Sequence, residues 1–228
     1  MVCVKQKKPS PLKDMTLKEK VEHIWEYYRI HIFITLFILF FTGSMINHLF
    51  INPPKQAGVF VGFIGKYLDM EQAERVQEIL TKEIVQDPTE ETEAKVDHFM
   101  INPDSPELME ISMANTQKLM AMLASREIDI IVANSSDFNE YIQQQAFIPL
   151  TELFTEEELK QWEELWLQGK TEEDRIAKIY GIYLWDNPIV EELRFVADKP
   201  VIGIVSNTER VEKAKETLKW FLNRQIEK

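Results

Sequence analysis

The longest hydrophobic segment of the chain covers residues 30–51, which run for 22 positions without an Asp, Glu, Lys or Arg. As an α-helix, this run reaches about 33 Å, enough to cross a hydrocarbon core about 30 Å thick. We therefore expect a transmembrane helix over residues 30–52, which ends where Asn52 is followed by two prolines. The helix separates a short N-terminal segment from a large C-terminal domain.

The segment before this helix divides into two parts. Residues 1–15 are basic and rich in proline, which is typical of a tail attracted to anionic lipid head groups. Residues 16–29 begin with Thr16 and Glu19 at the spacing of a capping box and predict a juxtamembrane helix that runs into the span. A cytoplasmic helix that docks a partner is the alternative.

Charge predicts the orientation of the membrane helix. Residues 1–29 carry seven basic and four acidic side chains, a net charge of +3, so the overall charge of −12 leaves −15 for the rest. Short basic flanks stay in the cytoplasm, so we expect a single-pass protein of the cell membrane with its C-terminal domain outside. Lys55 occupies the position that a cleavage site ending at Ala57 would need small, which favours an uncleaved anchor over a cleaved signal.

Beyond the membrane helix, short runs of β-branched and aromatic residues alternate with helical patterns. The expected strands cover residues 58–64, 96–101, 128–133, 176–185 and 199–205. Strands that alternate with helices pair in parallel through right-handed crossovers. Residues 57–228 are thus predicted to form one α/β domain with a mostly parallel sheet between two helical layers.

Polar residues predict where the helices of this domain begin. The expected N-terminal signals are Asp69, Ser105 before Pro106, Ser135 or Ser136, Thr155 with Glu158, and Ser206 with Glu209. Spacing predicts which apolar residues face inward, including Leu108, Ile111, Leu119, Met122 and Leu123 in one helix and Val211, Ala214, Leu218, Phe221 and Leu222 in the last. Trp162 and Trp166 favour a core role, with a carbohydrate-stacking surface as the alternative.

Residues for catalysis or for a cofactor do not form a known pattern. There is no Gly-rich phosphate loop, no His-Glu-x-x-His and no Gly-x-Ser-x-Gly, and the four histidines and Cys3 lack the spacing of metal ligands. The acidic domain cannot neutralise phosphates, so a nucleic acid is not an expected partner. We expect neither an enzyme nor a cofactor, and we expect the lipid bilayer and either another membrane protein or a small solute as partners.

A ligand site, where one exists, is expected at the carboxyl ends of the parallel strands, where loops and helix N-termini meet. The residues predicted to gather there are Lys66, Tyr67, Asn134, Ser135, Ser136, Trp185, Asp186, Asn187, Ser206 and Asn207. The alternative is that the serines and asparagines are ordinary helix caps.

Four stretches in order, residues 117–132, 147–153, 178–184 and 200–222, are similar to extracytoplasmic solute-binding proteins of ABC importers. The resemblance covers most of residues 57–225 and implies a domain like lobe I of a type II periplasmic-binding-protein fold. Members of that family have two lobes that close on a solute, whereas residues 183–199 here leave almost no room for a second lobe.

Two functions follow as hypotheses. The first is a membrane-anchored, non-enzymatic binding or interaction domain, an accessory or sensing subunit of a transport-related membrane complex. The alternative is a reduced solute-binding protein that captures a small molecule or peptide for an ABC transporter. An exposed apolar patch near the strand ends favours the first, and a concave polar pocket that contains Tyr67 or Trp185 favours the second.

Overall fold

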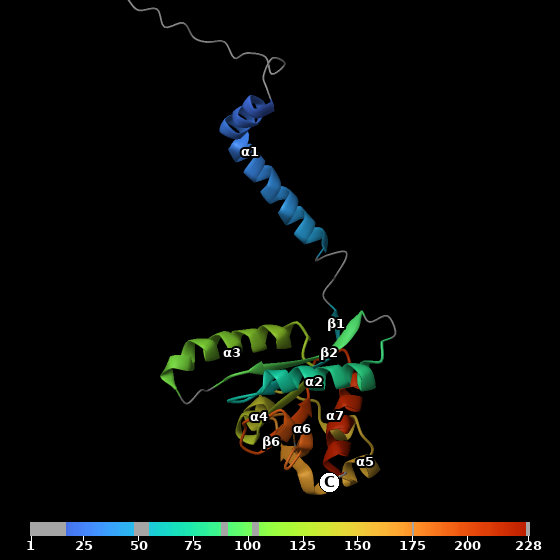
Figure 1. Cartoon of the computed structure of the whole chain (residues 1–228). Helices are drawn as coiled ribbons and strands as arrows, with labels where there is room; N and C mark the ends of the chain where they lie inside the picture. Colours follow the sequence, from blue (N-terminus) through green and yellow to red (C-terminus); the bar gives the residue numbers. More distant parts are fainter. Residues whose placement is uncertain (1–16, 48–54, 88–90, 102–104, 175, 227–228) are drawn as a thin grey trace, which may run out of the picture. The chain divides into compact units, whose positions relative to one another are not determined.

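The computed structural model describes residues 17–47, 55–87, 91–101, 105–174 and 176–226, and Figure 1 shows their helices and strands. The chain divides into two units, Met1–Pro54 and Lys55–Lys228, which are described separately. The predictions for residues 1–16, for His48 and for the prolines after Asn52 lie outside the described residues.

In the N-terminal unit, the structure describes one helix, α1 (Leu17–Ile46), of 30 residues. Up to Ile46, the predicted juxtamembrane helix and the predicted membrane span are therefore parts of one continuous helix, and the end of the span at Asn52 lies outside the described residues. Its stretch Tyr28–Ile46 is long and apolar enough to cross a membrane, and large side chains such as Phe37 and Phe40 are exposed within this unit. By length and composition, α1 qualifies as a membrane anchor or a signal sequence.

The second unit is built on a six-stranded sheet in the order β2-β1-β3-β6-β5-β4. The strands are β1 (Gln56–Ile64), β2 (Thr92–Phe99), β3 (Ile130–Asn134), β4 (Trp166–Gly169), β5 (Lys178–Tyr183) and β6 (Pro200–Ile204). β1 pairs in parallel with β2 and β3, as predicted. The β3–β6, β6–β5 and β5–β4 pairs are antiparallel, so the sheet is mixed and the prediction of a mostly parallel sheet holds for one half only.

The direction of β6 follows from its connection to β5. A parallel strand needs a crossover that returns the chain along the full length of the sheet, usually through a long helix. Residues 184–199 contain only the short helix α6 (Pro188–Glu192), so β6 runs back beside β5. The resulting α/β domain has a mixed sheet with a parallel β2–β1–β3 part.

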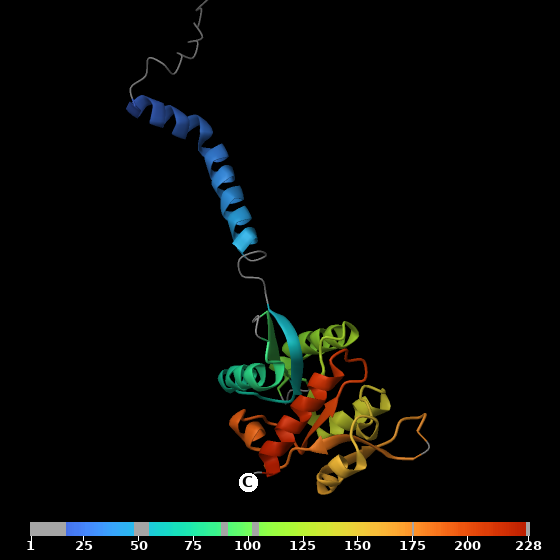
Figure 2. The same cartoon turned by 90° about the vertical axis from the view of Figure 1, so that its right-hand side faces the viewer.

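Helices cover both faces of the sheet. Besides α6, they are α2 (Met70–Leu80), α3 (Met109–Ala124), α4 (Ser135–Gln143), α5 (Glu156–Lys160) and α7 (Val211–Ile226), with short π or 3₁₀ turns at Thr81–Val85, Pro106–Leu108, Leu150–Glu152 and Glu163–Leu165. Side chains of α2 and α7 belong to one apolar core, and side chains of α3 and α4 belong to the other. Figure 2 shows α2 and α3 on opposite sides of β1.

The residues that cap the helices agree with the prediction from the sequence in three cases and differ from it in two. Asp69, Ser105 and Thr155 with Glu158 cap their helices as predicted. Asn134, rather than Ser135 or Ser136, caps α4, because its extended backbone lets its side chain accept from the N–H of Asp137. The last helix begins at Val211, so Ser206 lies too far upstream to cap it.

The predicted core positions are mostly confirmed. Trp162 is buried and the indole N–H of Trp166 donates to the carbonyl of Leu159 at 3.0 Å, so the core interpretation is right and a stacking surface at Trp162 is wrong. On α7, Ala214, Leu218, Phe221 and Leu222 are buried. The prediction that Ile111 of α3 faces inward is wrong, because half of its surface is exposed.

A candidate binding pocket at the switch point of the sheet

The carboxyl ends of β1 and β3 lie side by side, and the chain leaves them toward opposite faces of the sheet. After β1 it enters α2, which packs into one core, and after β3 it enters α4, which packs into the other. A crevice opens where neighbouring parallel strands send their connections to opposite faces, and open α/β sheets bind ligands at this point. The topology therefore places a candidate site between residues 65–67 and residues 134–137.

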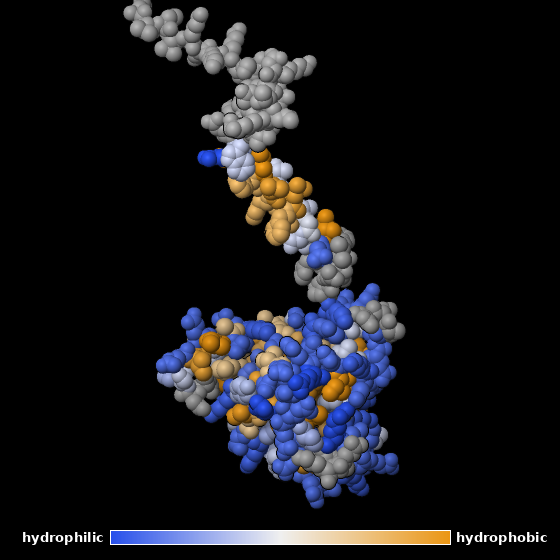
Figure 3. All heavy atoms as spheres, in the orientation of Figure 1, coloured by the Kyte–Doolittle hydropathy of each residue, from blue (hydrophilic) through white to orange (hydrophobic). Residues whose placement is uncertain are grey.

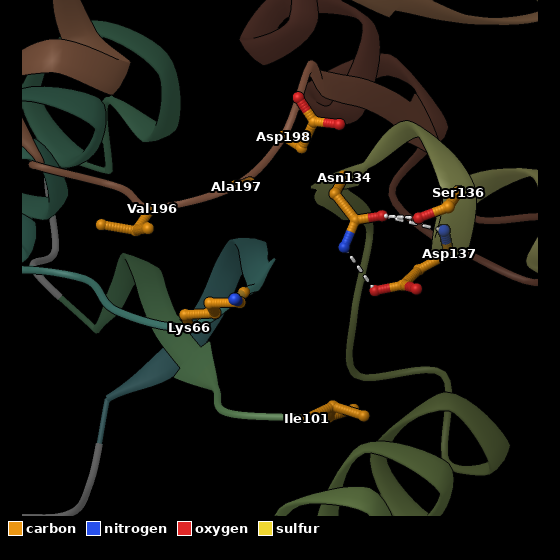
Figure 4. A pocket seen from close by; sticks show the side chains of 9 residues that line it. Lys66, Ile101, Asn134, Ser136, Asp137, Val196, Ala197 and Asp198 are labelled. Atoms are coloured by element: carbon orange, nitrogen blue, oxygen red, sulfur yellow. Dashed lines mark hydrogen bonds between the residues drawn. The ribbon is translucent and has the colours of Figure 1, made fainter. Parts of the chain in front are cut away.

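A cavity of about 460 Å³ lies at this position (Figure 4). Four segments line it, namely the end of β1, the residues after β2, the start of α4 and the connection before β6. The lining residues are Gly65, Lys66, Ile101, Asn134, Ser136, Asp137, Val196, Ala197 and Asp198. We call this cavity the switch-point pocket.

Asn134 organises one wall of the switch-point pocket. Its amide oxygen accepts from the hydroxyl of Ser136 at 2.6 Å and from the backbone N–H of Asp137 at 2.9 Å. Its amide nitrogen donates to the carboxylate of Asp137 at 2.7 Å. These three hydrogen bonds, drawn in Figure 4, fix the rotamers of the polar side chains at the start of α4.

Residues 196–198 cross from the end of β1 to the end of β3 and form another wall. The N–H of Lys66 donates to the carbonyl of Val196, and the N–H of Val196 donates to the carbonyl of Tyr67. At the other end, the N–H of Ser135 donates to the carbonyl of Asp198 at 3.3 Å. The crossing segment is thus held by backbone hydrogen bonds, which leave its side chains available to the pocket.

The connection that contains this segment follows a sharply turned path. Asp186, Arg194 and Lys199 all have a positive φ, at 53°, 48° and 49°. For residues other than glycine, this left-handed conformation costs about 1 kcal/mol each and persists where the surroundings impose it. Here the imposed path brings residues 196–198 back across the strand ends.

Gly65 lines the switch-point pocket, and His98 of β2 contacts Gly65. A side chain at Gly65 would place its Cβ about 2.5 Å from the ring of Phe195, so only glycine allows this close approach. A ring nitrogen of His98 lies 3.0 Å from the carbonyl oxygen of Gly65. Burial lowers the pKa of His98, and the Gly65 carbonyl and Asp97 oppose that shift.

The charge of the pocket is mixed and slightly acidic. Lys66 supplies one ammonium group and extends toward the middle of the pocket (Figure 4), whereas Asp137 and Asp198 supply two carboxylates. Among the residues that the structure describes, no group of three His, Cys, Asp or Glu side chains could hold a metal ion. The arrangement suits hydrogen bonding and charge pairing with a small polar molecule.

The structure brings together only some of the predicted site residues. Lys66, Asn134 and Ser136 line the switch-point pocket, whereas Ser135 and Tyr67 contribute backbone hydrogen bonds beside it. The sequence prediction missed Asp137, Asp198 and Ile101. Asp198 belongs to a connection that returns to the strand ends through tertiary contacts, and no local pattern indicates that return.

Trp185, Asp186 and Asn187 lie in an adjoining cavity of about 520 Å³, which shares Ala197 with the switch-point pocket. The ring of Trp185 stacks on Tyr183 with their centroids 4.5 Å apart, and 43% of its surface is exposed. Asn187 caps α6 and donates to the carbonyl of Phe221 at 2.9 Å. The capping interpretation is therefore right for Asn187.

Ser206 and Asn207 lie at the other end of the central strands, away from the pocket. β6 is antiparallel to β3, so the residues after β6 meet the start of β3 and not its end. The N–H of Ser206 donates to the carbonyl of Ala146, and the amide of Asn207 donates to the carbonyl of Leu123 at the end of α3. These two residues are not part of the pocket, which corrects the prediction that grouped them with Lys66.

Comparisons of the chain with models of known protein families, with curated proteins and with solved structures gave no match. The geometry of the pocket and the charge pattern of the chain are accordingly the basis for assigning a function.

Proposed function

We propose that the chain is a membrane-anchored, non-enzymatic binding protein whose C-terminal domain lies outside the cell and binds a small polar solute in the switch-point pocket. In this role it is a sensing or accessory subunit of a membrane complex. The observation that carries the proposal is the position of the pocket, which coincides with the place where α/β sheets gather their ligand-binding loops.

The charge pattern supports the proposed location. Residues 1–29 are net +3 and the remainder of the chain is net −15, which favours a cytoplasmic N-terminus. The stretch Tyr28–Ile46 supplies the apolar length that a membrane anchor needs.

The lining of the pocket supports a solute that carries an amino group. Asp137 and Asp198 can pair with an ammonium group, and Lys66 can pair with a carboxylate of the same molecule. The acidic domain as a whole attracts cations toward its surface, which increases the rate of encounter. Zwitterionic and cationic solutes therefore fit better than anionic ones.

The hydrogen bonds of the pocket support binding rather than catalysis. The hydroxyl of Ser136 donates to the amide oxygen of Asn134, and an amide oxygen is not a general base that could activate a nucleophile. Asn134 uses its own groups to hold α4 and Asp137.

Thermal unfolding of the full chain in detergent, with panels of amino acids, polyamines, sugars and dicarboxylates, tests the proposal. A solute present at 100 times its dissociation constant stabilises the protein by about 2.7 kcal/mol, which is readily measured as a shift in Tm. We expect a shift with amino compounds that Lys66→Ala and Asp198→Asn reduce. Lys170→Ala, which removes an exposed lysine outside the pocket, is the matched control. No shift with any class of solute would contradict the proposal.

Capture of a solute for an importer is the second candidate function. The adjoining cavity favours it, because it is polar and contains the exposed ring of Trp185. A ligand-induced shift that Trp185→Ala abolishes and Lys66→Ala leaves intact would move the site to that cavity.

A further inference from the structure

Helix α3 exposes several large apolar side chains and buries polar ones. Toward the sheet it places Ser112, which is buried, and Asn115, whose amide donates to the carbonyl of Met100. Toward solvent it places Met109, Met113 and Met120, which are 52%, 60% and 46% exposed. Figure 3 shows hydrophobic colours gathered over this helix. Exposed methionines grouped in this way are typical of protein interaction surfaces.

Four of the exposed apolar residues of α3 form a regular band. Met109, Met113, Met120 and Ala124 follow one another at intervals of four, seven and four residues. At 3.6 residues per turn, they fall within about 60° of one another around the helix axis. We call these four residues the methionine band.

The spacing of the methionine band is the same when it is read in either direction. An antiparallel copy of the helix, related by a two-fold axis, therefore places Met113 opposite Met120 of the second copy and Met109 opposite Ala124. Large side chains meet at the centre, and a large side chain meets a small one at each end. Such self-complementarity is what a two-fold interface between identical subunits requires.

Two other ways in which this domain could make a contact, with a lipid surface through α3 or with an added strand at β2, fit the structure less well. An anionic lipid surface fits poorly, because the methionine band contains no basic residue and Lys118, on the same helix, is paired with Asp97 at 2.5 Å. Strand addition at the β2 edge is also blocked. The backbone N–H groups of alternate residues there donate to side chains, as seen for Thr92 with Asp87, Ala94 with Thr81, Val96 with Gln77, and His98 with Asp97.

The size of the methionine band explains why a membrane anchor matters. Stable interfaces between proteins in solution use about 20–30 residues a side, far more than one band of four. Two copies held in the same membrane have a much higher effective concentration, which makes a small contact sufficient. We propose that the methionine band is the contact through which two membrane-anchored copies of this chain associate, with their α3 helices antiparallel. This contact is independent of the proposed solute site.

Cysteine crosslinking of the full chain in lipid membranes tests the proposal. Cys3 is the single cysteine, so Cys3→Ser provides a clean background. Gln117→Cys lies beside the expected two-fold axis, and mild oxidation should join two copies. Ile111→Cys is the matched control, because Ile111 is 50% exposed on the same helix but lies on the other flank of its exposed surface. It should crosslink at least about tenfold less, because the same position in the second copy lies too far away for a disulfide to form.

The orientation is tested by mixing two variants. A chain with Met113→Cys and a chain with Met120→Cys should crosslink to each other, whereas Met113→Cys alone should crosslink poorly, because like positions lie about 10 Å apart along antiparallel helices. Efficient crosslinking of Met113→Cys with itself would show a parallel contact and overturn the arrangement.

Disruption of the contact supplies the last test. Met120→Glu should reduce the Gln117→Cys crosslink at least about tenfold, because a carboxylate would be buried without a partner, and Ile111→Glu should leave it unchanged. Thermal unfolding of each variant verifies that the domain is folded. Equal crosslinking of Gln117→Cys and Ile111→Cys, no crosslinking of either, or a crosslink to a different protein would overturn the proposal.

Discussion

Helices α3 and α7 have the same length, 16 residues, but they use their apolar residues in opposite ways. In α3, ten residues are apolar, of which Leu119 alone is fully buried. In α7, seven are apolar, and five of these (Ala214, Leu218, Trp220, Phe221 and Leu222) are buried. The more hydrophobic helix is therefore the one that contributes less to the core. A surplus of apolar surface on an ordered helix indicates that the surface has another use.

The charged and polar contacts of the two helices show the same contrast. α7 is fixed along its length, because the indole of Trp220 donates to Glu83, Arg224 pairs with Glu83, and Lys219 pairs with Glu158. The residue before α7 is also fixed, because Arg210 pairs at 2.8 Å with the fully buried carboxylate of Asp129. α3 makes its ion pair through Lys118 and keeps the methionine band clear of charge.

The largest expected effect comes from the core face of α7. Phe221→Ala should lower the free energy of unfolding by about 4 kcal/mol, because it empties a fully buried site that contacts Phe63 and Trp220. Denaturant unfolding of the full chain in detergent measures the change. The control is Asn223→Ala on the exposed face of α7, which should be close to neutral. Equal effects would show that α7 does not close the core.

A smaller effect is expected within α3. Leu119→Ala should cost about 3 kcal/mol, because Leu119 is fully buried between the helix and the sheet. Met113→Ala should change the free energy of unfolding by less than about 0.5 kcal/mol, because its side chain is mostly in solvent. A large loss of stability for Met113→Ala would mean that the methionine band belongs to the core of a single chain.

The smallest effect concerns the pH dependence of the α7 contacts. The ammonium of Lys219 and the backbone N–H of Thr155 lower the pKa of Glu158 from 4.5 to about 2. A carboxyl group whose pKa is lowered by folding stabilises the fold above its unfolded pKa, and this stabilisation is lost as the pH falls from about 4.5 to about 2. Glu158→Gln should therefore flatten the fall of Tm in this range.

Glu157→Gln, one residue earlier and exposed, is the control for this measurement and should keep the pH profile of the native chain. Identical profiles for Glu157→Gln and Glu158→Gln would remove the pair of Glu158 and Lys219 from the contacts that hold α7.

Several features could be predicted because they depend on neighbouring residues. Asp69 and Thr155 cap helices because their short polar side chains reach the N–H groups two or three residues later. The parallel pairing of β1 with β2 and β3 follows from the helices between them. For the site, the same rule placed Lys66, Asn134 and Ser136 at one edge of the sheet.

Asp137 and Asp198 were missed because they enter the pocket for different reasons. Asp137 is drawn in by its hydrogen bonds with Asn134, which caps the helix in place of the predicted serines. Asp198 is brought in by a connection that crosses the strand ends. Both depend on contacts whose partners the sequence pattern could not name.

The sequence by itself determined the apolar run that forms most of α1 and the alternation of strands and helices from β1 to α4, but not β4, whose first residue, Trp166, follows the helical spacing of Leu159 and Trp162. Only the tertiary structure decided that β6 runs antiparallel, that residues 196–198 return to the strand ends, and that nothing among the described residues covers the methionine band of α3. The physical reason is that periodicity is a property of one segment, whereas strand direction and burial depend on which distant segment packs against it.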